Sequence, residues 1–355
     1  MAIALNDPNI LETMDSVQES DGTPISVLRL ARVKPWEGRI SEARERLKSF
    51  QPDWVSFQFV PFGYHRKGLC AGLGRKLAAI NSKTTWHVMF HELWLGLDEK
   101  TPLKYRLLGA MQRTFIRDMI HNLQPRVVHT QAEPYRQVLT REKIPASVLP
   151  LISNVPYVEG DGWTGLLGPL LAAAGHPMDR TKLYAAGIFG SVHPEWSAEE
   201  AVNVLFPLVK KSQKRLVLVF LGRNNLAPAA LDELKSRLGD RADVVAAGER
   251  SIEEISKILQ SLDIGLATSP RQAIQKSGSV AAMLEHGLPV LVTRDDWRLR
   301  GIELQSKDMP LRLLTPKEFV LLDTLPIREA QMAGNGRLKW IAGQMLGALQ
   351  ASPAN

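Results

Sequence analysis

Cysteine is almost absent from this sequence: Cys70 is the single example in 355 residues. One thiol cannot form an internal disulfide, and it cannot supply the several thiolates of a cysteine-rich zinc site. Disulfide-stapled domains and zinc-finger-like domains are therefore excluded. So little cysteine suits a reducing compartment, and we expect a cytoplasmic protein, with the inner face of the membrane as a second place where it could act.

Long apolar runs are also missing. No run reaches the roughly 18–20 residues that a membrane-spanning helix needs. The nearest candidate, residues 163–174, is shorter and contains glycines and a proline. The first five residues are mostly apolar, but Asn6, Asp7 and Pro8 follow at once, so we expect no signal peptide. The sequence predicts a protein whose contact with a membrane, if any, is peripheral.

Nucleic-acid-binding patterns are absent as well. The formal net charge is +7 and the pI is about 9.5, but the 44 basic residues are scattered among 37 acidic ones. The sequence has no zinc-finger spacing, no RNP-like aromatic pattern and no arginine tract. The excess of positive charge therefore favours an anionic substrate or an anionic membrane surface, and we expect no nucleic-acid partner.

What the sequence does contain is a regular alternation of short apolar runs and amphipathic helical patterns, which predicts parallel sheets covered by helices on both faces. We expect strands at residues 54–60, 85–90, 126–130, 146–151, 182–188, 215–221, 243–246, 263–268 and 289–293. We expect helices at residues 35–50, 69–80, 102–123, 134–142, 198–211, 227–238, 251–260, 278–286 and 326–351.

The length suggests about two domains. Residues 153–156 and a group of glycines between 160 and 168 interrupt the alternation. We therefore predict an α/β chain of two Rossmann-like domains, residues 1–165 and 166–325, which face each other across a cleft. The helix at 326–351 can pack back on the first domain.

The most informative stretch lies between the last two predicted strands, where a helix begins at Lys276-Ser277-Gly278-Ser279. The first backbone N–H groups of a helix have no intrahelical partner, and the helix dipole places partial positive charge there. Gly278 permits close approach, and the neighbouring side chains add donors and charge, which suits a phosphate. Glu285, two turns on, could reach ribose hydroxyls. An ordinary helix cap explains the same residues, and the motif alone does not decide between the two.

Other polar residues follow the predicted strands. The carboxyl ends of parallel strands meet at one edge of a sheet, and ligands bind in the crevice there. The candidates at such ends are His91 and Glu92 in the first half, and Gly190, Ser191, His193, Arg223, Gly248 and Arg250 in the second.

With these residues, the chain resembles GT-B glycosyltransferases, most closely the GT4-like group. The likeness covers roughly residues 180–300, and the run from Gln275 to Val290 carries it. It implies that Glu285 holds the ribose of a nucleotide sugar, and that Gly190, Ser191 and Arg223 lie near the diphosphate. It implies further that Gly248 and Arg250 lie on the side of the base.

The sequence departs from the family pattern at two places. The first of its two glutamates, which touches the sugar, is replaced by Ser277, and Pro194-Glu195-Trp196 stands where the family has a Lys-Gly pair. Lys276 could restore the missing positive charge. The donor sugar and the stereochemistry are therefore open.

The first half matches the family less closely. Phe90-His91-Glu92 resembles the strand-end histidine and acid of the acceptor domain. The family normally opens with a strand and a glycine-rich turn, whereas residues 3–8 here resemble its second strand. We therefore expect that the first strand-helix unit is missing from this chain.

Several candidate side chains could have a functional or a structural role. His91 could contact the donor sugar or take a proton from an acceptor, or it could be a hydrogen-bonded packing residue. Glu92 could be a base or the partner of an arginine. His193 could approach the diphosphate. His87 alternates with apolar residues inside a strand, which favours a place in the core.

The resemblance implies a glycosyltransferase that moves a sugar from a nucleotide-sugar donor to a glycan or lipid-linked acceptor, with retention at the anomeric carbon. No Asp-Xaa-Asp pair ends a strand, so we expect neither a metal nor another cofactor. Two alternatives stay open: a sugar-nucleotide epimerase of the same architecture, and a degenerate or truncated copy that binds without turnover.

Overall fold

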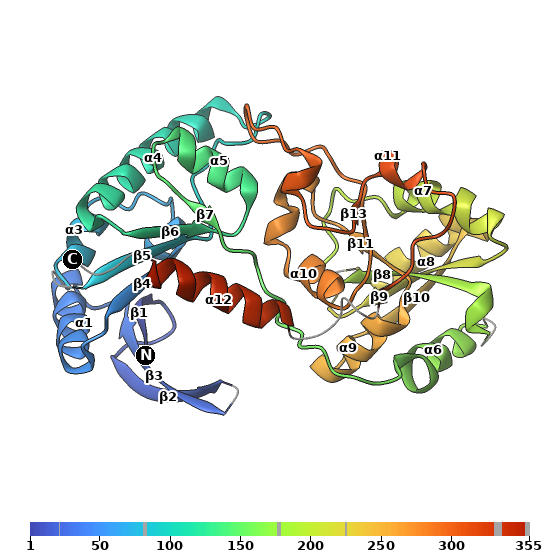
Figure 1. The fold of residues 1–355 in the computed structure, drawn as a ribbon, viewed down its shortest axis with the longest axis horizontal. Coiled ribbons are helices and arrows are strands. Elements are labelled where there is room, and N and C mark those ends of the chain that lie inside the picture. The colour runs from blue at the N-terminus through green and yellow to red at the C-terminus, as the bar shows by residue number, and fades with distance from the viewer. Residues whose placement is uncertain (21, 81–83, 176–178, 224–225, 330–335, 352–355) are drawn as a thin grey trace. The chain divides into compact units, whose positions relative to one another are not determined.

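The computed structural model describes residues 1–20, 22–80, 84–175, 179–223, 226–329 and 336–351 (Figure 1). The chain divides into two compact units. The first comprises Met1–Thr130, Tyr135–Val148 and Leu346–Asn355, and the second Gln131–Pro134 and Leu149–Met345. The predicted boundary between residues 165 and 166 lies inside the second unit, within a π-helical turn, Trp163–Leu167.

The first unit contains two separate sheets. One has the order β1-β3-β2, with β1 parallel and β2 antiparallel to β3; the other is fully parallel in the order β4-β5-β6-β7. The strands are β1 (Ala2–Asp7), β2 (Met14–Ser20), β3 (Thr23–Ala31), β4 (Trp54–Phe59), β5 (Thr85–Phe90), β6 (Val127–Thr130) and β7 (Ser147–Val148). The helices are α1 (Trp36–Phe50), α2 (Pro61–Tyr64), α3 (Leu73–Ala78), α4 (Leu103–Leu123) and α5 (Glu133–Arg141).

Two features of this unit were not predicted from the sequence. The hairpin of β2 and β3 was not predicted, because β2 is polar and almost wholly exposed and so lacks a buried face. The helix predicted from Leu69 begins only at Leu73, and the preceding loop contains the short helix α2.

The second unit is built on one six-stranded parallel sheet with the order β10-β9-β8-β11-β12-β13. Its strands are β8 (Leu183–Phe189), β9 (Arg215–Leu221), β10 (Asp243–Gly248), β11 (Ile264–Ala267), β12 (Val290–Val292) and β13 (Leu313–Leu314). Its helices are α6 (Gly168–Ala173), α7 (Ala198–Lys211), α8 (Pro228–Leu238), α9 (Ile252–Ser261), α10 (Gly278–Glu285) and α11 (Pro316–Phe319). The last helix, α12 (Gly336–Gln350), contributes residues to both units.

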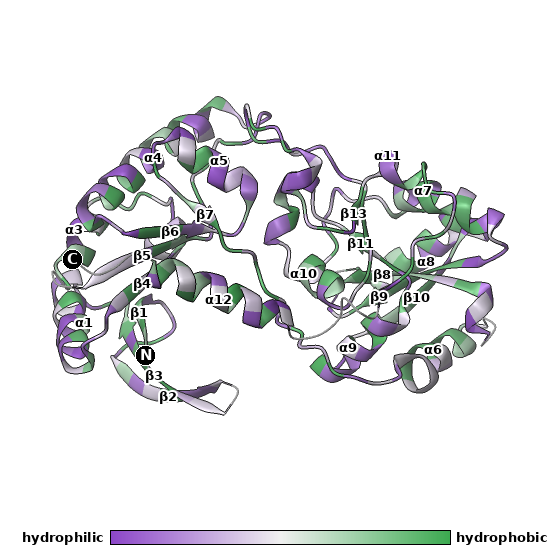
Figure 2. Ribbon diagram, viewed as in Figure 1, coloured by the Kyte–Doolittle hydropathy of each residue, from purple (hydrophilic) through white to green (hydrophobic). Residues whose placement is uncertain are grey.

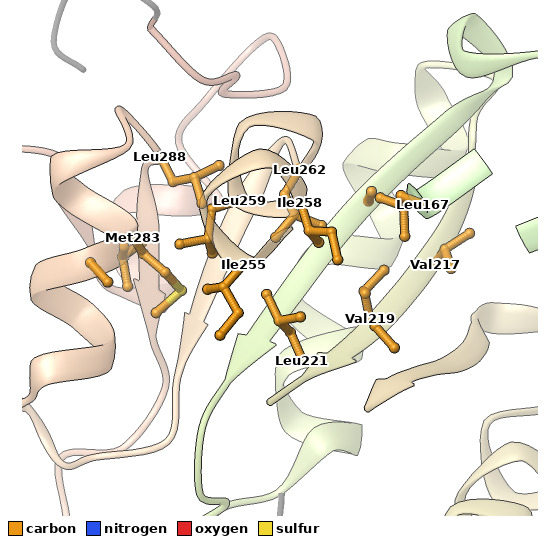
Figure 3. Packing of buried hydrophobic residues seen from close by; sticks show 14 of the residues in the cluster. Leu167, Val217, Val219, Leu221, Ile255, Ile258, Leu259, Leu262, Met283 and Leu288 are labelled. Atoms are coloured by element: carbon orange, nitrogen blue, oxygen red, sulfur yellow. The ribbon is translucent and has the colours of Figure 1, made fainter. Parts of the chain in front are cut away.

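Both faces of this sheet are buried, which explains why its strands read as continuous apolar runs (Figure 2). On one face Val217, Val219 and Leu221 of β9 meet Ile258 and Leu259 of α9 (Figure 3). On the other face the alternate residues of the same strand pack against α7 and α8. The prediction of an α/β chain with parallel sheets covered by helices is therefore confirmed.

The order of the strands fixes where a ligand can bind. Counted from β8, the sheet runs third, second, first, fourth, fifth, sixth, so the direction of the connections reverses between β8 and β11. In such sheets the crevice lies at this reversal, beyond the carboxyl ends of the two strands. The residues that follow β8 and β11 are therefore the candidates for a site.

Candidate diphosphate site at the reversal of strand order

Gly190 directly follows β8 and lies against the amino end of α10. Its φ is +80°, a conformation that favours glycine, and a Cβ at this position would lie 2.8 Å from the Ser279 Oγ. The structure thus brings together two residues that the sequence placed in the same site but on different loops. A side chain at position 190 would therefore require the Ser279 hydroxyl to move.

Two more strands end in the same way. Gly222 after β9 and Gly248 at the end of β10 also have positive φ, at +84° and +69°. The Gly190 N–H donates to the Leu221 carbonyl at 2.9 Å, and the Gly222 N–H donates to the Gly248 carbonyl at 2.8 Å. Each loop is therefore held to its neighbour by main-chain bonds, which aligns the three turns along one edge of the sheet.

The amino end of α10 has an ordinary N-cap and also has hydrogen-bond donors that the cap does not use. The Ser277 Oγ accepts the Val280 N–H at 3.3 Å, so the expected cap is present. By helix geometry the amides of Gly278 and Ser279 have no partner within the helix. The cap leaves the Ser277 hydroxyl hydrogen unused, and all three residues are partly accessible. A small anion could be bound by these groups.

The loop that leads into this helix is ordered rather than irregular. A 3-10 helix, Arg271–Lys276, leads from β11 to the start of α10. The buried side chain of Gln272 holds it in place: its Oε1 accepts the Leu299 N–H at 2.7 Å and its Nε2 donates to the Ile302 carbonyl at 3.3 Å. Lys276, at its end, is half-buried and lies directly before the capping serine.

Arg294, which was not among the predicted site residues, joins the loops that follow β8 and β11. Its side chain is 3% exposed. It donates to Asp296 at 2.9 and 2.6 Å, to the Glu195 Oε2 at 2.5 Å and to the Thr268 carbonyl at 3.3 Å. The Thr268 Oγ1 in turn donates to the Ser191 carbonyl at 3.2 Å. An arginine directly after a buried strand and before two aspartates was the available signal.

Glu285, the predicted ribose ligand, is the last residue of α10 and is already engaged. Its Oε1 accepts the Ser153 N–H at 3.0 Å and forms an ion pair with the Arg337 Nε at 3.4 Å. Burial raises the pKa of this carboxyl, against the opposing effects of the Ser153 amide and Arg337. A ribose would have to use the second carboxylate oxygen or displace one of these partners.

The remaining candidate side chains of the second unit lie near the carboxyl edge of its sheet. Arg223 is exposed and forms two hydrogen bonds with Glu249, at 3.0 and 3.2 Å. This pairing lowers the pKa of Glu249 and raises that of Arg223. Arg250 donates to the Ala247 carbonyl at 2.9 Å, and the His193 Nδ1 accepts the Glu195 N–H at 3.2 Å. These partners hold the side chains near the edge of the sheet, and a role in ligand binding stays a prediction for all three.

His91 and Glu92 belong to the first unit and directly follow β5. The His91 N–H donates to the Phe59 carbonyl at 3.1 Å, and the His91 Nε2 lies 2.8 Å from the Gln58 Oε1. Both side chains are partly accessible. His87, assigned to the core, is indeed buried, and its Nε2 lies 3.0 Å from the Nδ1 of the buried His129.

In the described ranges no group of three or more His, Cys, Asp or Glu residues could hold a metal ion. Asp295 and Asp296 are occupied by Arg298 and Arg294 respectively. Independence from a metal stays a prediction. Within the same ranges, no helix combines the length and the apolar character that crossing a membrane would require.

No family model matches the sequence, and no curated protein shows significant similarity to it. Among solved structures, the chain is similar to Anabaena Alr3699/HepE in complex with UDP and glucose, at 12% identity and a TM-score of 0.49, over 92% of this chain and 86% of that one. It is also similar to sucrose-phosphate synthase from Thermosynechococcus elongatus, at 13% identity and a TM-score of 0.43, over 82% and 70% of the two chains.

A glycosyltransferase from Rickettsia africae is similar at 13% identity and a TM-score of 0.46, over 75% of this chain and 66% of that one. Glycosyltransferase structures are thus among those to which the fold of this chain is similar. At such low identity the likeness concerns the fold alone and assigns no function to this chain.

Proposed function

We propose that this protein is a glycosyltransferase that moves a sugar from a nucleotide sugar to a glycan or lipid-linked acceptor. The observation that carries the proposal is the position of the α10 amino end at the reversal of strand order, in contact with Gly190. Unpartnered amides, a helix dipole and a close glycine turn together favour a diphosphate. A nucleotide sugar presents its diphosphate in such a crevice.

The chemistry follows from where negative charge develops. As the bond from the sugar to the diphosphate breaks, charge accumulates on the leaving nucleoside diphosphate, and fixed donors stabilise it. The amides of Gly278 and Ser279 supply these donors, and Lys276, two residues before Gly278, adds positive charge to the same segment. In this proposal the reaction needs no metal and proceeds with retention, and His91 contacts the donor sugar or accepts a proton from the acceptor hydroxyl.

A peripheral membrane contact is part of the proposal, because a lipid-linked acceptor would require one. Leu103, Leu107 and Met111 lie one above another on α4 and are 64%, 62% and 51% exposed. Lys104 and Arg106 are exposed on the same turns. Exposed apolar side chains bordered by basic ones suit the surface of an anionic membrane.

The decisive experiment measures nucleoside diphosphate binding. A thermal-shift panel of nucleoside diphosphates and nucleotide sugars should contain at least one compound that raises the Tm by about 5 °C at a concentration of 100 Kd. Lys276→Ala and Glu285→Ala should each weaken that binding, measured by calorimetry, by about tenfold. Lys211→Ala removes the same charge at the last residue of α7, at the opposite edge of the sheet, and should bind like the parent.

If both site variants bind as tightly as the parent, the assignment of the site is wrong. Transfer is tested separately, by incubating the nucleotide sugar that binds with and without glycan and lipid-linked acceptors. A new sugar formed from UDP-N-acetylglucosamine without any acceptor would identify an epimerase instead. Binding without turnover in every acceptor mixture would identify a non-catalytic copy.

A further inference from the structure

A chain of hydrogen bonds crosses the parallel sheet of the first unit and ends at His91. The Nδ1 of the buried His129 lies 3.0 Å from the His87 Nε2, and the His87 Nδ1 lies 2.8 Å from the Ser56 Oγ. The Gln58 Nε2 donates to the same Ser56 Oγ at 2.7 Å, and the Gln58 Oε1 lies 2.8 Å from the His91 Nε2. Three neighbouring strands, β6, β5 and β4, supply the first four of these residues.

The orientation of the Gln58 amide decides the role of the His91 nitrogen that it meets. The Gln58 NH₂ donates to the Ser56 Oγ, which has two lone pairs and one hydrogen and can therefore either donate to the His87 Nδ1 or accept from it. At the other end, the Gln58 oxygen can only accept, so the His91 Nε2 must carry a proton.

We infer that Gln58 is a positioning residue, which holds neutral His91 in the Nε2–H tautomer and leaves its Nδ1 as the proton-accepting atom. A neutral imidazole has one donor and one acceptor nitrogen, and the partner of one nitrogen fixes the role of the other. The catalytic use of Nδ1 depends on the function proposed above, whereas the tautomer of His91 does not.

The interior end of the chain consists of two buried rings. Burial lowers the pKa of His87 to about 4, with a further contribution from His129, and burial also lowers the pKa of His129. Both rings are therefore neutral near pH 7, which lets one donate to the other. Turning the Gln58 amide over would place the His91 proton on Nδ1, so the tautomer of His91 reports the orientation of that amide.

The test is the ¹⁵N spectrum of histidine-labelled protein near pH 8, with His91 assigned from the His91→Gln variant. In the parent, Nδ1 of His91 should show the shift of an unprotonated nitrogen and Nε2 that of a protonated one. Gln58→Leu should give averaged shifts that indicate a mixture of tautomers. Gln18→Leu makes the same change on an exposed residue of β2 and should leave the His91 shifts unchanged.

An Nδ1–H tautomer in the parent, or parent-like shifts in Gln58→Leu, would overturn the inference. Unchanged backbone amide spectra away from β4 establish that the variant is folded. Where the parent shows turnover, Gln58→Leu should lower kcat about tenfold with little change in KM. Gln58→Glu retains the acceptor and should restore most of the activity, with the acid limb of the kcat profile moved to higher pH. A parent without turnover refutes the proposed function and leaves the tautomer measurement valid.

Discussion

Gly190 lies so close to Ser279, at the carboxyl edge of the sheet of the second unit, that a Cβ on residue 190 would lie 2.8 Å from the Ser279 Oγ. Gly190 directly follows β8 and Ser279 is the second residue of α10, so this close approach joins the two loops at the reversal of strand order. The candidate diphosphate site depends on this contact.

Gly190→Ala is therefore expected to disturb both stability and binding. The left-handed backbone and the steric conflict should together cost about 1–3 kcal/mol. Displacement of α10 should weaken nucleoside diphosphate binding by at least about tenfold. Urea unfolding and calorimetry measure the two effects.

The double variant Gly190→Ala/Ser279→Ala separates the two causes, because it relieves the steric conflict and keeps the strained backbone. It should recover part of the lost stability. Gly165→Ala is the matched control, since a Cβ there meets nothing within 4 Å and the backbone is not strained. A Gly190→Ala variant as stable as this control would refute the role of the contact.

Arg294→Met is predicted to lower the free energy of unfolding by about 2–4 kcal/mol, because a buried arginine loses its bonds to Asp296, Glu195 and a main-chain carbonyl. Loosened loops should also weaken nucleoside diphosphate binding. Arg298→Met removes an exposed arginine that pairs with Asp295 three positions away, and should change stability by less than about 0.5 kcal/mol. Equal effects of the two variants in urea unfolding would contradict the prediction.

The stability of the first unit is predicted to fall in mild acid. The pKa of His87 is lowered by burial to about 4 in the folded chain, below its ordinary value of 6.5. The unfolded chain therefore binds a proton more readily, and His87 stabilises the fold fully above pH 6.5. That contribution, at most about 3 kcal/mol, is lost as the pH falls toward 4.

Urea midpoints at pH 7 and pH 5 measure this loss. The parent should lose more stability between the two values than His87→Gln, in which the titrating group is gone. His121→Gln replaces an exposed histidine of α4 and should follow the parent. Identical pH dependence in all three proteins would show that His87 does not carry the effect.

Binding to anionic vesicles is predicted to depend on the apolar stripe of α4. Replacing Leu103, Leu107 and Met111 together by serine should reduce sedimentation with phosphatidylglycerol vesicles by about tenfold. These side chains are exposed, so the triple variant should keep the Tm of the parent within a few degrees. Leu311→Ser, which alters an 80% exposed leucine of the second unit, is the control. Vesicle binding that survives the triple replacement would remove the membrane contact from the proposal.

Much of the secondary structure was predictable because its causes are local. Ser251 and Glu254 form a capping box at the start of α9, where the sequence predicted a helix, and Gly287, with φ of +80°, follows α10 where the sequence predicted its end. The bounds of α7 and β9 were predicted without error. Strands that are buried on both faces can be recognised in the sequence as apolar runs, whereas the exposed strand β2 has no such pattern.

For the candidate site, the sequence determined the kinds of residue and their places at the ends of strands and at the start of a helix, because capping, periodicity and turn chemistry act over a few positions. Strand order, and with it the meeting of Gly190 with Ser279, was decided only by the tertiary structure. The same is true of the bonds of Arg294 and of the chain from His129 to His91. Such contacts join residues far apart in the sequence, and they exist only once the register of neighbouring strands is set, which no local pattern specifies.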